Sequence, residues 1–536
     1  MHPSALAKRL YILLFIVIVA LYLYGLGSLP LLGPDEPRYA QVAREMFVRG
    51  DLITPTLGGH TWFEKPALLY WLMIAAYKVF GVSEFSARLG PALCGLLTVA
   101  AVWRVGRAIE TTDQTDGSDQ VQNFAFWSTL VAASALGLIV FSRAASFDVV
   151  ITMTTTWSLA FFIMHKLDVG KKSVLLIGFY ICVGLSLLAK GLVGLVIPFG
   201  VVGSYYLIRR EWPNRQLWLS LIWGVPLATA VSALWYGPVI ARHGWPFIDE
   251  FFLQHHFARY VSNKYHHPQP IYFYPAIILM LALPWTGYLV EALAKIRGWA
   301  WRENDALSIA RVFSLAWLLF PIVFFSFSGS KLPGYILPAL PAAAFLISDR
   351  LQSTARWPVL TTGVICLALA VGGFVYAIQS GHISIACGAA MAIPMVVAAG
   401  ASFFLRDQRV TFAMVIAGST FVLVMLVAIC AAPRIAQRES VKALLELADA
   451  RGYGNAPVLA QRSDDRSAQF YAHDRVIYNA EGEPVTFDEV TVDQARALGG
   501  RILVFIQLEY VDEFRGAPSI EILGDNGRMA VLGWKP

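Results

Sequence analysis

The sequence predicts a polytopic α-helical membrane protein with a small soluble α/β domain at its C-terminal end. Hydrophobic residues make up 57% of the 536 residues and charged residues only 15%, and the mean hydropathy is +0.58. A soluble chain of this length would carry a larger charged surface. Long apolar runs recur up to residue 432 and stop there, so we expect a transmembrane domain at 1–432 and a soluble domain at 433–536.

Thirteen apolar segments are candidate membrane spans, because each approaches the length that an α-helix needs to cross a bilayer. The segment at 67–80 is shorter and contains Tyr70, Tyr77 and Lys78, so we interpret it as re-entrant or interfacial. The candidates are 10–26, 88–108, 124–141, 148–165, 173–189, 191–208, 217–241, 272–293, 309–327, 333–349, 357–379, 382–405 and 410–432.

The basic residues set the predicted orientation. If 67–80 does not cross, every dense cluster of Lys and Arg between spans shares the face of Lys8 and Arg9. The positive-inside rule assigns that face to the cytoplasm. The C-terminal domain and two polar loops, 27–87 and 242–271, then lie outside. The net charge of +6 reflects this loop bias, since the chain shows no basic domain or motif for nucleic acid.

The first external loop contains an amphipathic pattern from about residue 38 to residue 48, typical of a helix on the membrane surface. Asp35 and Glu36 precede it, between two prolines. Carboxylates at a helix start often act as caps, so Glu36 is either a cap or a site residue, and Asp35 could do both. Arg38 and Arg44 could equally be solvated charges at lipid headgroups, the interpretation that we favour for Arg44.

Further polar residues cluster near the external ends of the spans. Glu64 and Lys65 precede the re-entrant segment, where a lysine is suited to meet a lipid phosphate. Asp148 begins a span, which makes it a functional candidate, and a salt bridge with Arg143 is the structural alternative. Lys190, followed by a glycine, could instead extend to the headgroups.

The segment SGSKLPGYILPALP opens a later span and carries Lys331 and Tyr335 four residues apart. Pro333 and Gly334 make this backbone irregular, which is tolerated at membrane depth where it lines a cavity. A cation and a phenol at such a break could bind an anion. Tyr335 could also be an ordinary interfacial aromatic residue.

The second external loop carries His255, His256 and Arg259, and an arginine at this position is a good phosphate ligand. Adjacent histidines do not share a helix face, so zinc bound by Glu64 with His255 or His256 would need further ligands from elsewhere. The five cysteines lie in apolar segments without metal-ligand spacing, so we expect core residues and no disulfide framework.

The soluble part shows the pattern of a small α/β domain. Residues 439–450 are predicted to be a helix, and 457–460, 476–478, 501–507 and 520–523 are predicted to be short strands. A Gly-x-Gly at Gly452 and Gly454 lacks a preceding strand, so it is a weak signal for nucleotide binding.

Several motifs, taken together and in this order, resemble a known family. PDEPRYA, FEKP, the region of Asp148, AKG, HHFARY and KLPGYIL are similar to the bacterial aminoarabinose transferase (ArnT) family, within the protein-mannosyltransferase-like GT-C glycosyltransferases. The resemblance implies a GT-C fold with about thirteen spans and an external C-terminal domain. It also implies transfer of a sugar, 4-amino-4-deoxy-L-arabinose above all, from undecaprenyl phosphate to lipid A at the periplasmic face of the bacterial inner membrane.

The resemblance also implies roles for individual residues. Asp35 matches the acidic residue that is the usual catalytic candidate, and Asp148 is a second carboxylate. Departure of the polyprenyl phosphate creates a dianion, which nearby cations and phenols would stabilise as it forms. No cofactor is required, although Glu64 and a histidine at 255 or 256 lie where the family can hold a metal. The expected phosphate ligands are Lys65, Arg259, Lys331 and Tyr335, and Glu36, Arg38 and Lys190 are further site candidates.

Two alternatives stay open. A related transferase could carry another sugar, or use another envelope or protein acceptor. A transporter for a lipid-linked sugar belongs to a different class, and it would place charges near the bilayer midplane. Here the charges gather at one predicted face and on large loops, which favours the enzyme.

Overall fold

A computed structural model describes residues 5–115, 123–258, 269–351, 353, 355–460, 466–480, 482–487, 490–497, 500–517 and 519–535. The chain forms two compact units. The first comprises Met1–Tyr24, Glu64–Leu69 and Pro91–Leu426, and the second comprises Gly25–Phe63, Tyr70–Gly90 and Val427–Pro536. Most of the loop predicted at 27–87 thus groups with the C-terminal part of the chain. As separate domains, 1–432 and 433–536 stay a prediction.

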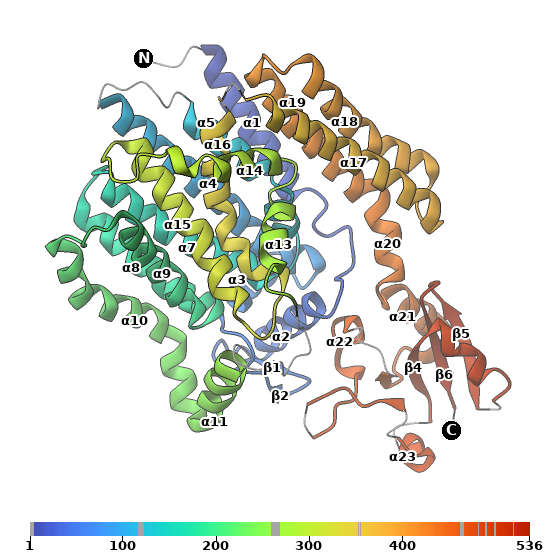
Figure 1. The fold of residues 1–536 in the computed structure, drawn as a ribbon. Helices are drawn as coiled ribbons and strands as arrows, with labels where there is room; N and C mark the ends of the chain where they lie inside the picture. Colours follow the sequence, from blue (N-terminus) through green and yellow to red (C-terminus); the bar gives the residue numbers. More distant parts are fainter. Residues whose placement is uncertain are drawn as a thin grey trace. The chain divides into compact units, whose positions relative to one another are not determined.

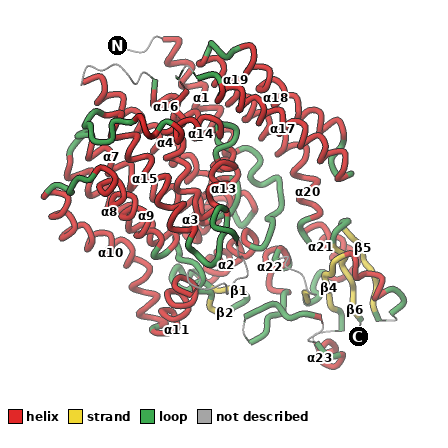
Figure 2. The backbone as a smooth tube through the Cα atoms, viewed as in Figure 1, coloured by secondary structure: helices red, strands yellow, loops and turns green. Residues whose placement is uncertain are grey.

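The first unit is built from helices, the red segments of Figure 2. Two more helices, α3 (Leu68–Phe80) and α4 (Glu84–Thr115), contain residues of both units. The first unit contains α1 (Ala5–Leu23), α5 (Phe124–Ser134), α6 (Leu136–Ser142), α7 (Phe147–Lys166), α8 (Lys172–Lys190), α9 (Val193–Arg209), α10 (Arg215–His243), α11 (Trp245–Ile248), η1 (Asp249–Ala258), α13 (Phe273–Leu281), α14 (Thr286–Ala294), η2 (Ile296–Gly298), α15 (Ala306–Ser326), η3 (Pro333–Ala339), α16 (Leu340–Leu351), α17 (Trp357–Ser380), α18 (Ile385–Phe404) and α19 (Arg409–Leu426) (Figure 1).

Each of the thirteen predicted spans coincides with a helix or with two consecutive helical segments. By length and hydropathy, eight helices of the described chain could cross a membrane, and nine could if α5 and α6, bent by 58°, form one span. The polytopic helical class is confirmed. The number thirteen stays a prediction, because the segments predicted at 124–141, 272–293 and 333–349 are each divided between two elements.

Two of these breaks satisfy each other's backbone groups. The amide of Leu136, the first residue of α6, donates a hydrogen bond of 2.9 Å to the carbonyl oxygen of Leu283, between α13 and α14. Pro284 follows and has no amide hydrogen to continue a helix. The indole nitrogen of Trp285 donates to the hydroxyl of Ser134 at 2.9 Å. Polar groups released by both breaks thereby find partners within the protein.

Helix α7 shows how a run of hydroxyl groups fits inside an apolar bundle. The side chains of Thr152, Thr155 and Thr156 each donate to the carbonyl oxygen four residues earlier, at 2.6 Å. These internal bonds satisfy the hydroxyls without help from a neighbouring helix. The helix packs against α8 and η3, and it carries Asp148 as its second residue.

The second unit contains a four-stranded sheet in the order β3-β4-β6-β5, in which β3 pairs parallel with β4 and the other pairs are antiparallel (Figure 2). Hydrophobic side chains are buried on both faces of the central strand β4. The elements are α2 (Asp35–Arg49), β1 (Thr56–Leu57), β2 (His60–Thr61), η4 (Val427–Ala431), α20 (Ala432–Arg438), α21 (Lys442–Ala448), η5 (Asp449–Tyr453), β3 (Val458–Ala460), α22 (Ser467–Tyr471), η6 (His473–Arg475), α23 (Val492–Ala497), β4 (Ile502–Gln507), η8 (Leu508–Phe514), β5 (Ile520–Asp525) and β6 (Met529–Trp534).

The amphipathic helix of the first loop is present as α2, its apolar face is covered by protein, and its place on the membrane surface stays a prediction. Tyr39, Val42 and Met46 are at most 5% exposed, and α2 packs against α22 of the same unit. The apolar stripe is therefore covered by protein. An amphipathic pattern reports that one face is buried, and it does not tell which surface buries it.

Three expectations need correction. Residues 476–478 form isolated bridges in place of a strand. The strand β6 was not predicted, because its run MAVLGW has only one β-branched residue, whereas ILVFIQ of the predicted strand β4 has three. Cys387 and Cys430 are disulfide-bonded, whereas Cys94, Cys182 and Cys366 are free. Apolar surroundings alone do not distinguish a buried thiol from a disulfide.

Candidate functional site

Asp148 and Lys190 form an ion pair where α7 begins and α8 ends. Lys190, the last residue of α8, donates a short hydrogen bond to Oδ1 of Asp148. The hydroxyl of Ser146 caps α7 by accepting from the amide of Asp148 at 3.1 Å. The lysine side chain is 16% exposed and the aspartate side chain 20%. Lys190 therefore does not extend to lipid headgroups, and Asp148 has a partner other than the predicted alternative, Arg143.

Tyr335 covers the same ion pair from η3. The ammonium nitrogen of Lys190 lies 4.6 Å from the centre of the Tyr335 ring, within the range of a cation–π contact. The ring packs 5.3 Å from Phe325, whose ring lies 6.2 Å from that of Tyr274. Tyr335 thus belongs to an aromatic wall beside the charged pair, and it is not an isolated interfacial residue.

Gly334 allows η3 to approach Asp148 closely. A Cβ atom at this position would lie 2.0 Å from Oδ2 of Asp148 and 2.8 Å from the ring of Phe141. Neither distance is compatible with van der Waals contact, so any larger residue must displace the carboxylate or the backbone. The sequence indicated an irregular backbone here, but the steric need for a glycine was not predicted.

Lys331 lies four residues before Tyr335 in the sequence, and its ammonium binds a backbone carbonyl of its own loop. Its Nζ atom donates to the carbonyl oxygen of Ser328 at 2.8 Å. The residue is 8% exposed. The hydroxyl of Ser328 in turn donates to the carbonyl oxygen of Ser330 at 3.0 Å. This bonding stabilises the turn that leads into η3.

Glu64 and Lys65 form another ion pair of the first unit. The two side chains are 2.7 Å apart and only 10% and 14% exposed. Among the described residues, no group of three or more His, Cys, Asp or Glu side chains is arranged to hold a metal ion. His255 lies on the π-helix η1, and the side chain of His256 is not among those described. The zinc site at Glu64, His255 and His256 stays a prediction.

Asp35 and Arg38 form a partly exposed pair in the second unit. Arg38 donates to Oδ1 of Asp35 at 2.7 Å, and the aspartate side chain is 53% exposed. The guanidinium lies 5.1 Å from the ring centre of Trp62 and 5.6 Å from that of Tyr39. Asp35 does not cap its helix, since it is the first residue of α2 and the N-cap residue is Pro34, with no side-chain cap bond. The carboxylate is accessible and has a cation fixed beside it.

Glu36 has a different environment from its neighbour. It accepts hydrogen bonds of 2.9 and 2.7 Å from Arg88 and one of 2.9 Å from the amide of Leu32. Glu36 is 8% exposed and Arg88 4%. Arg88 also donates to three backbone carbonyl oxygens, those of Leu26, Leu29 and Pro30. Glu36 is therefore neither a helix cap nor an accessible site residue, because it holds the loop in place.

Arg44 is likewise structural, and its predicted position at lipid headgroups is wrong. It is 7% exposed. It donates to the carbonyl oxygen of Phe470 at 3.0 Å, lies 5.1 Å from the Phe470 ring and contacts His473. Burial lowers the pKa of the Arg44 guanidinium, an effect opposed by Asp474.

The structure thus resolves the predicted site into separate groups. It brings Asp148, Lys190 and Tyr335 together in the first unit, and it pairs Asp35 with Arg38 in the second. Arg259 lies outside the described residues. Arg88 and Gly334 were missed, although an arginine in the first turns of an apolar helix is unusual enough to suggest a buried partner.

The comparisons with known proteins agree with this architecture. A family model described as dolichyl-phosphate-mannose-protein mannosyltransferase matches residues 8–293, more than half of the chain. The chain belongs to this family. The motif-based resemblance to GT-C glycosyltransferases is thereby confirmed at the level of the family.

Curated relatives of the family narrow the resemblance further. The chain is 32% identical over 349 residues to an undecaprenyl phosphate-alpha-4-amino-4-deoxy-L-arabinose arabinosyl transferase from Pseudomonas aeruginosa. It is 30% identical over 343 residues to a protein of the same name from Yersinia enterocolitica. These matches cover 64% and 63% of this chain, and the chain spans about 60% of the length of the curated relatives it matches.

Solved structures show the same fold. ArnT from Cupriavidus metallidurans, crystallised with undecaprenyl phosphate, superposes with a TM-score of 0.77 at 22% identity, and the match covers 98% of each chain. The oligosaccharyltransferase of Archaeoglobus fulgidus superposes with a TM-score of 0.52 at 12% identity, covering 95% of this chain and 71% of the other. The chain is accordingly a helical membrane protein of the GT-C type, as predicted.

Proposed function

We propose that the chain is a membrane glycosyltransferase that moves 4-amino-4-deoxy-L-arabinose from undecaprenyl phosphate to lipid A. The reaction would take place at the periplasmic face of the bacterial inner membrane, the side that the basic clusters leave for the external loops. The observation that carries the proposal is the Asp148–Lys190–Tyr335 group. It places a largely buried ammonium and a phenol at a helix end, in a chain that is 32% identical over 349 residues to an arabinosyl transferase.

This group would act mainly at the leaving phosphate. Breaking the bond between the anomeric carbon and the phosphate oxygen leaves the electron pair, and a second negative charge, on the polyprenyl phosphate. The Lys190 ammonium and the Tyr335 hydroxyl would stabilise that charge more in the transition state than in the ground state. The low dielectric at the membrane boundary strengthens both contacts.

Asp148 would position Lys190 rather than act as a base. Its carboxylate already binds the ammonium. Its amide donates to the hydroxyl of Ser146, which caps α7 and fixes the start of the helix. If the acceptor is a phosphate of lipid A, it is ionised at neutral pH and needs no base to attack. Asp35 is the more accessible carboxylate, and we assign it to the sugar, where it could bind the donor amine.

Of the remaining predicted phosphate ligands, we retain Lys65 as the main candidate. It is adjacent to α3 and paired with Glu64, so a phosphate would compete with that carboxylate. Lys331 is held by Ser328, and we assign it to the turn before η3. We propose that transfer requires no metal, and unchanged turnover after dialysis against a chelator is the expected result. If the chelator instead abolished turnover and zinc alone restored it, Glu64 would be assigned to a metal site.

Mass spectrometry of lipid A tests the proposal directly. Cells with the wild-type chain should add one aminopentose to lipid A, and cells without the chain should not. A Lys190→Met variant should strongly reduce the addition. Lys172→Met is its matched control, because Lys172 also pairs with an aspartate, Asp168, at the opposite and exposed end of α8. Unmodified lipid A in cells that make the lipid-linked sugar and the wild-type chain would refute the proposal.

A transferase for another sugar or acceptor is the second candidate. A reconstituted assay with purified undecaprenyl-phosphate aminoarabinose and lipid A separates the two, because only the first candidate releases undecaprenyl phosphate in that mixture. A transporter would move the lipid-linked sugar across the vesicle membrane without releasing undecaprenyl phosphate.

A further inference from the structure

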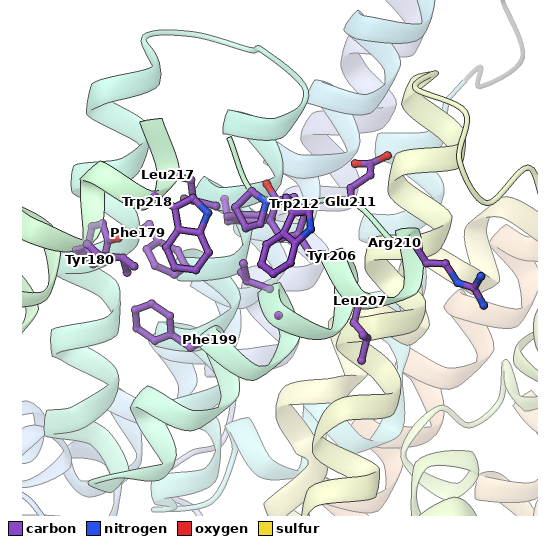
Figure 3. Close-up of a pocket in the computed structure, with 15 residues that line it drawn as sticks. Phe179, Tyr180, Phe199, Tyr206, Leu207, Arg210, Glu211, Trp212, Leu217 and Trp218 are labelled. Carbon is purple, nitrogen blue, oxygen red and sulfur yellow. The ribbon is translucent and has the colours of Figure 1, made fainter. Parts of the chain in front are cut away.

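A cavity of about 560 Å³ lies among α7, α8, α9 and the start of α10, in the first unit (Figure 3). Its volume falls in the range of small-molecule sites, roughly 300–1,000 Å³. Its wall is mainly apolar, nearly half of the lining residues are aromatic, and the close-up shows their rings around the cavity. The aromatic residues that line it include Phe179, Tyr180, Phe199, Tyr206, Trp212 and Trp218.

This cavity is distinct from the Asp148–Lys190 group. Lys190 lies beside the turn that joins α8 to α9, whereas the cavity is bordered by Arg210 and Glu211 just beyond the other end of α9. Helix α9 has 17 residues, which corresponds to about 25 Å at 1.5 Å per residue. The cavity therefore opens toward the face that the basic clusters assign to the cytoplasm.

The mouth of the cavity has the charge and the aromatic residues of a lipid headgroup region. Trp212 is 87% exposed and Trp218 50%, as expected for residues that lie at the membrane–water interface. Arg210 and Arg215 are exposed at the same end, and the guanidinium of Arg210 points away from the rings (Figure 3). The mouth therefore combines an apolar interior with a cationic edge.

The carboxylate at this mouth does not cancel the positive charge. Glu211 binds the fully buried Arg209 at 2.6 Å and Lys166 at 3.4 Å. Arg209 also donates to Asn304 and to two backbone carbonyl oxygens, those of Arg302 and Glu303. This bonding holds the loops at the edge of the cavity, and cations outnumber carboxylates around it.

We propose that the cavity binds one acyl chain of an anionic membrane phospholipid, whose headgroup phosphate lies at Arg210 and Arg215. Lipid tails are as apolar as the cavity wall, so the hydrophobic effect does not select the ligand. Retention comes from contacts with the rings, which an empty cavity would lose. Attraction between the headgroup and the arginines adds to it. Such a lipid would hold α8, α9 and α10 together at the end remote from Lys190.

Glycine positions supply a test that leaves the cationic edge intact. Gly203 lines the cavity, and a Cβ atom there would meet nothing within 4 Å. Gly203→Leu should therefore fill the space without distorting α9. Gly418→Leu is the matched control, because Gly418 is an exposed glycine of the membrane helix α19, also with nothing within 4 Å and outside the cavity lining.

The experiment is photocrosslinking of the full chain in phosphatidylethanolamine vesicles that contain phosphatidylglycerol with a diazirine on its acyl chain. Adducts should map to residues 199–221, fall at least fivefold in Gly203→Leu and stay unchanged in Gly418→Leu. Arg210→Gln should reduce the preference for phosphatidylglycerol over the same probe made from phosphatidylcholine about fivefold, the share expected for one cation.

Three results would overturn the proposal. Adducts at 199–221 that are unchanged in Gly203→Leu would show that the probe does not enter the cavity. Equal labelling by the phosphatidylcholine probe would exclude recognition of an anionic headgroup. Displacement of the probe by undecaprenyl phosphate would show that the cavity holds the tail of the polyprenyl carrier.

Discussion

The ammonium of Lys190 lies 4.6 Å from the ring centre of Tyr335, although 144 positions separate the two residues in the sequence. Lys190 donates to Asp148 at the same time. The three residues come from α8, η3 and α7, so the packing of these elements creates a group that none of them contains alone. In the proposed reaction, a cation held in this way would leave its carboxylate for the developing phosphate without first losing a full shell of water.

Replacing the lysine should separate catalysis from folding. Lys190→Met should lower the rate of transfer about 10²–10³-fold, the loss typical of removing one charge-stabilising donor. The matched variant Lys172→Met should keep the wild-type rate, because its ion pair is exposed and remote. Rates of undecaprenyl phosphate release in vesicles provide the measurement. Equal rates in the two variants would remove Lys190 from the mechanism.

Gly334 should be intolerant of a single methyl group. Gly334→Ala places an atom 2.0 Å from the carboxylate of Asp148, so the Asp148–Lys190 pair must move and transfer should fall at least tenfold. Gly372→Ala on α17 serves as the control, since a Cβ there meets nothing within 4 Å. Circular dichroism should show equal helix content for both variants. Full activity of Gly334→Ala would mean that the pair tolerates displacement.

Adjacent carboxylates on α2 should respond in opposite ways. Glu36→Ala leaves Arg88 as an uncompensated buried charge, which costs about 3–5 kcal/mol, and thermal unfolding in detergent should show a clear fall in Tm. Asp35→Asn removes only a half-exposed contact, typically worth about 0–1 kcal/mol, so Tm should stay close to the wild-type value while transfer is lost. An Asp35→Asn chain with normal turnover would exclude Asp35 from the chemistry.

The stability of the second unit should fall in mild acid because of His473. Burial and the neighbouring Arg44 lower the pKa of His473 below its usual value of about 6.5, and Asp474 opposes this shift. As the pH falls through 6.5, the unfolded chain takes up this proton before the folded chain does. The unfolded state then binds more protons, so the free energy of unfolding decreases.

His473→Asn should reduce that loss. Asparagine tolerates the left-handed backbone at this position, where φ is 54°. Comparison of Tm at pH 7.5 and pH 5.5 should show a smaller difference for His473→Asn than for the wild type. Replacement of the exposed His382 by Asn is the control. An unchanged difference in His473→Asn would assign the acid sensitivity to other groups.

Sequence reasoning located the helices well, because membrane spans and polar loops differ strongly in composition. It also selected Asp148, Lys190 and Tyr335 as candidates, since charge and aromatic polarity at span ends are costly and seldom incidental. It assigned the wrong surroundings to Arg44, and it did not foresee that protein covers the apolar face of α2. The groups that contact Arg44 and cover α2 come from α22, more than 400 positions away in the sequence. No local pattern reports such a contact.

The sequence by itself determined the class of the protein, the positions of its apolar segments and the kinds of residue available for chemistry, because hydropathy and charge are properties of each segment alone. Only the tertiary structure decided which charges meet. It pairs Glu36 with Arg88 and Asp148 with Lys190, and it leaves Asp35 accessible. Ion pairing depends on distances of a few ångströms between segments far apart in the chain, and these distances are set by packing.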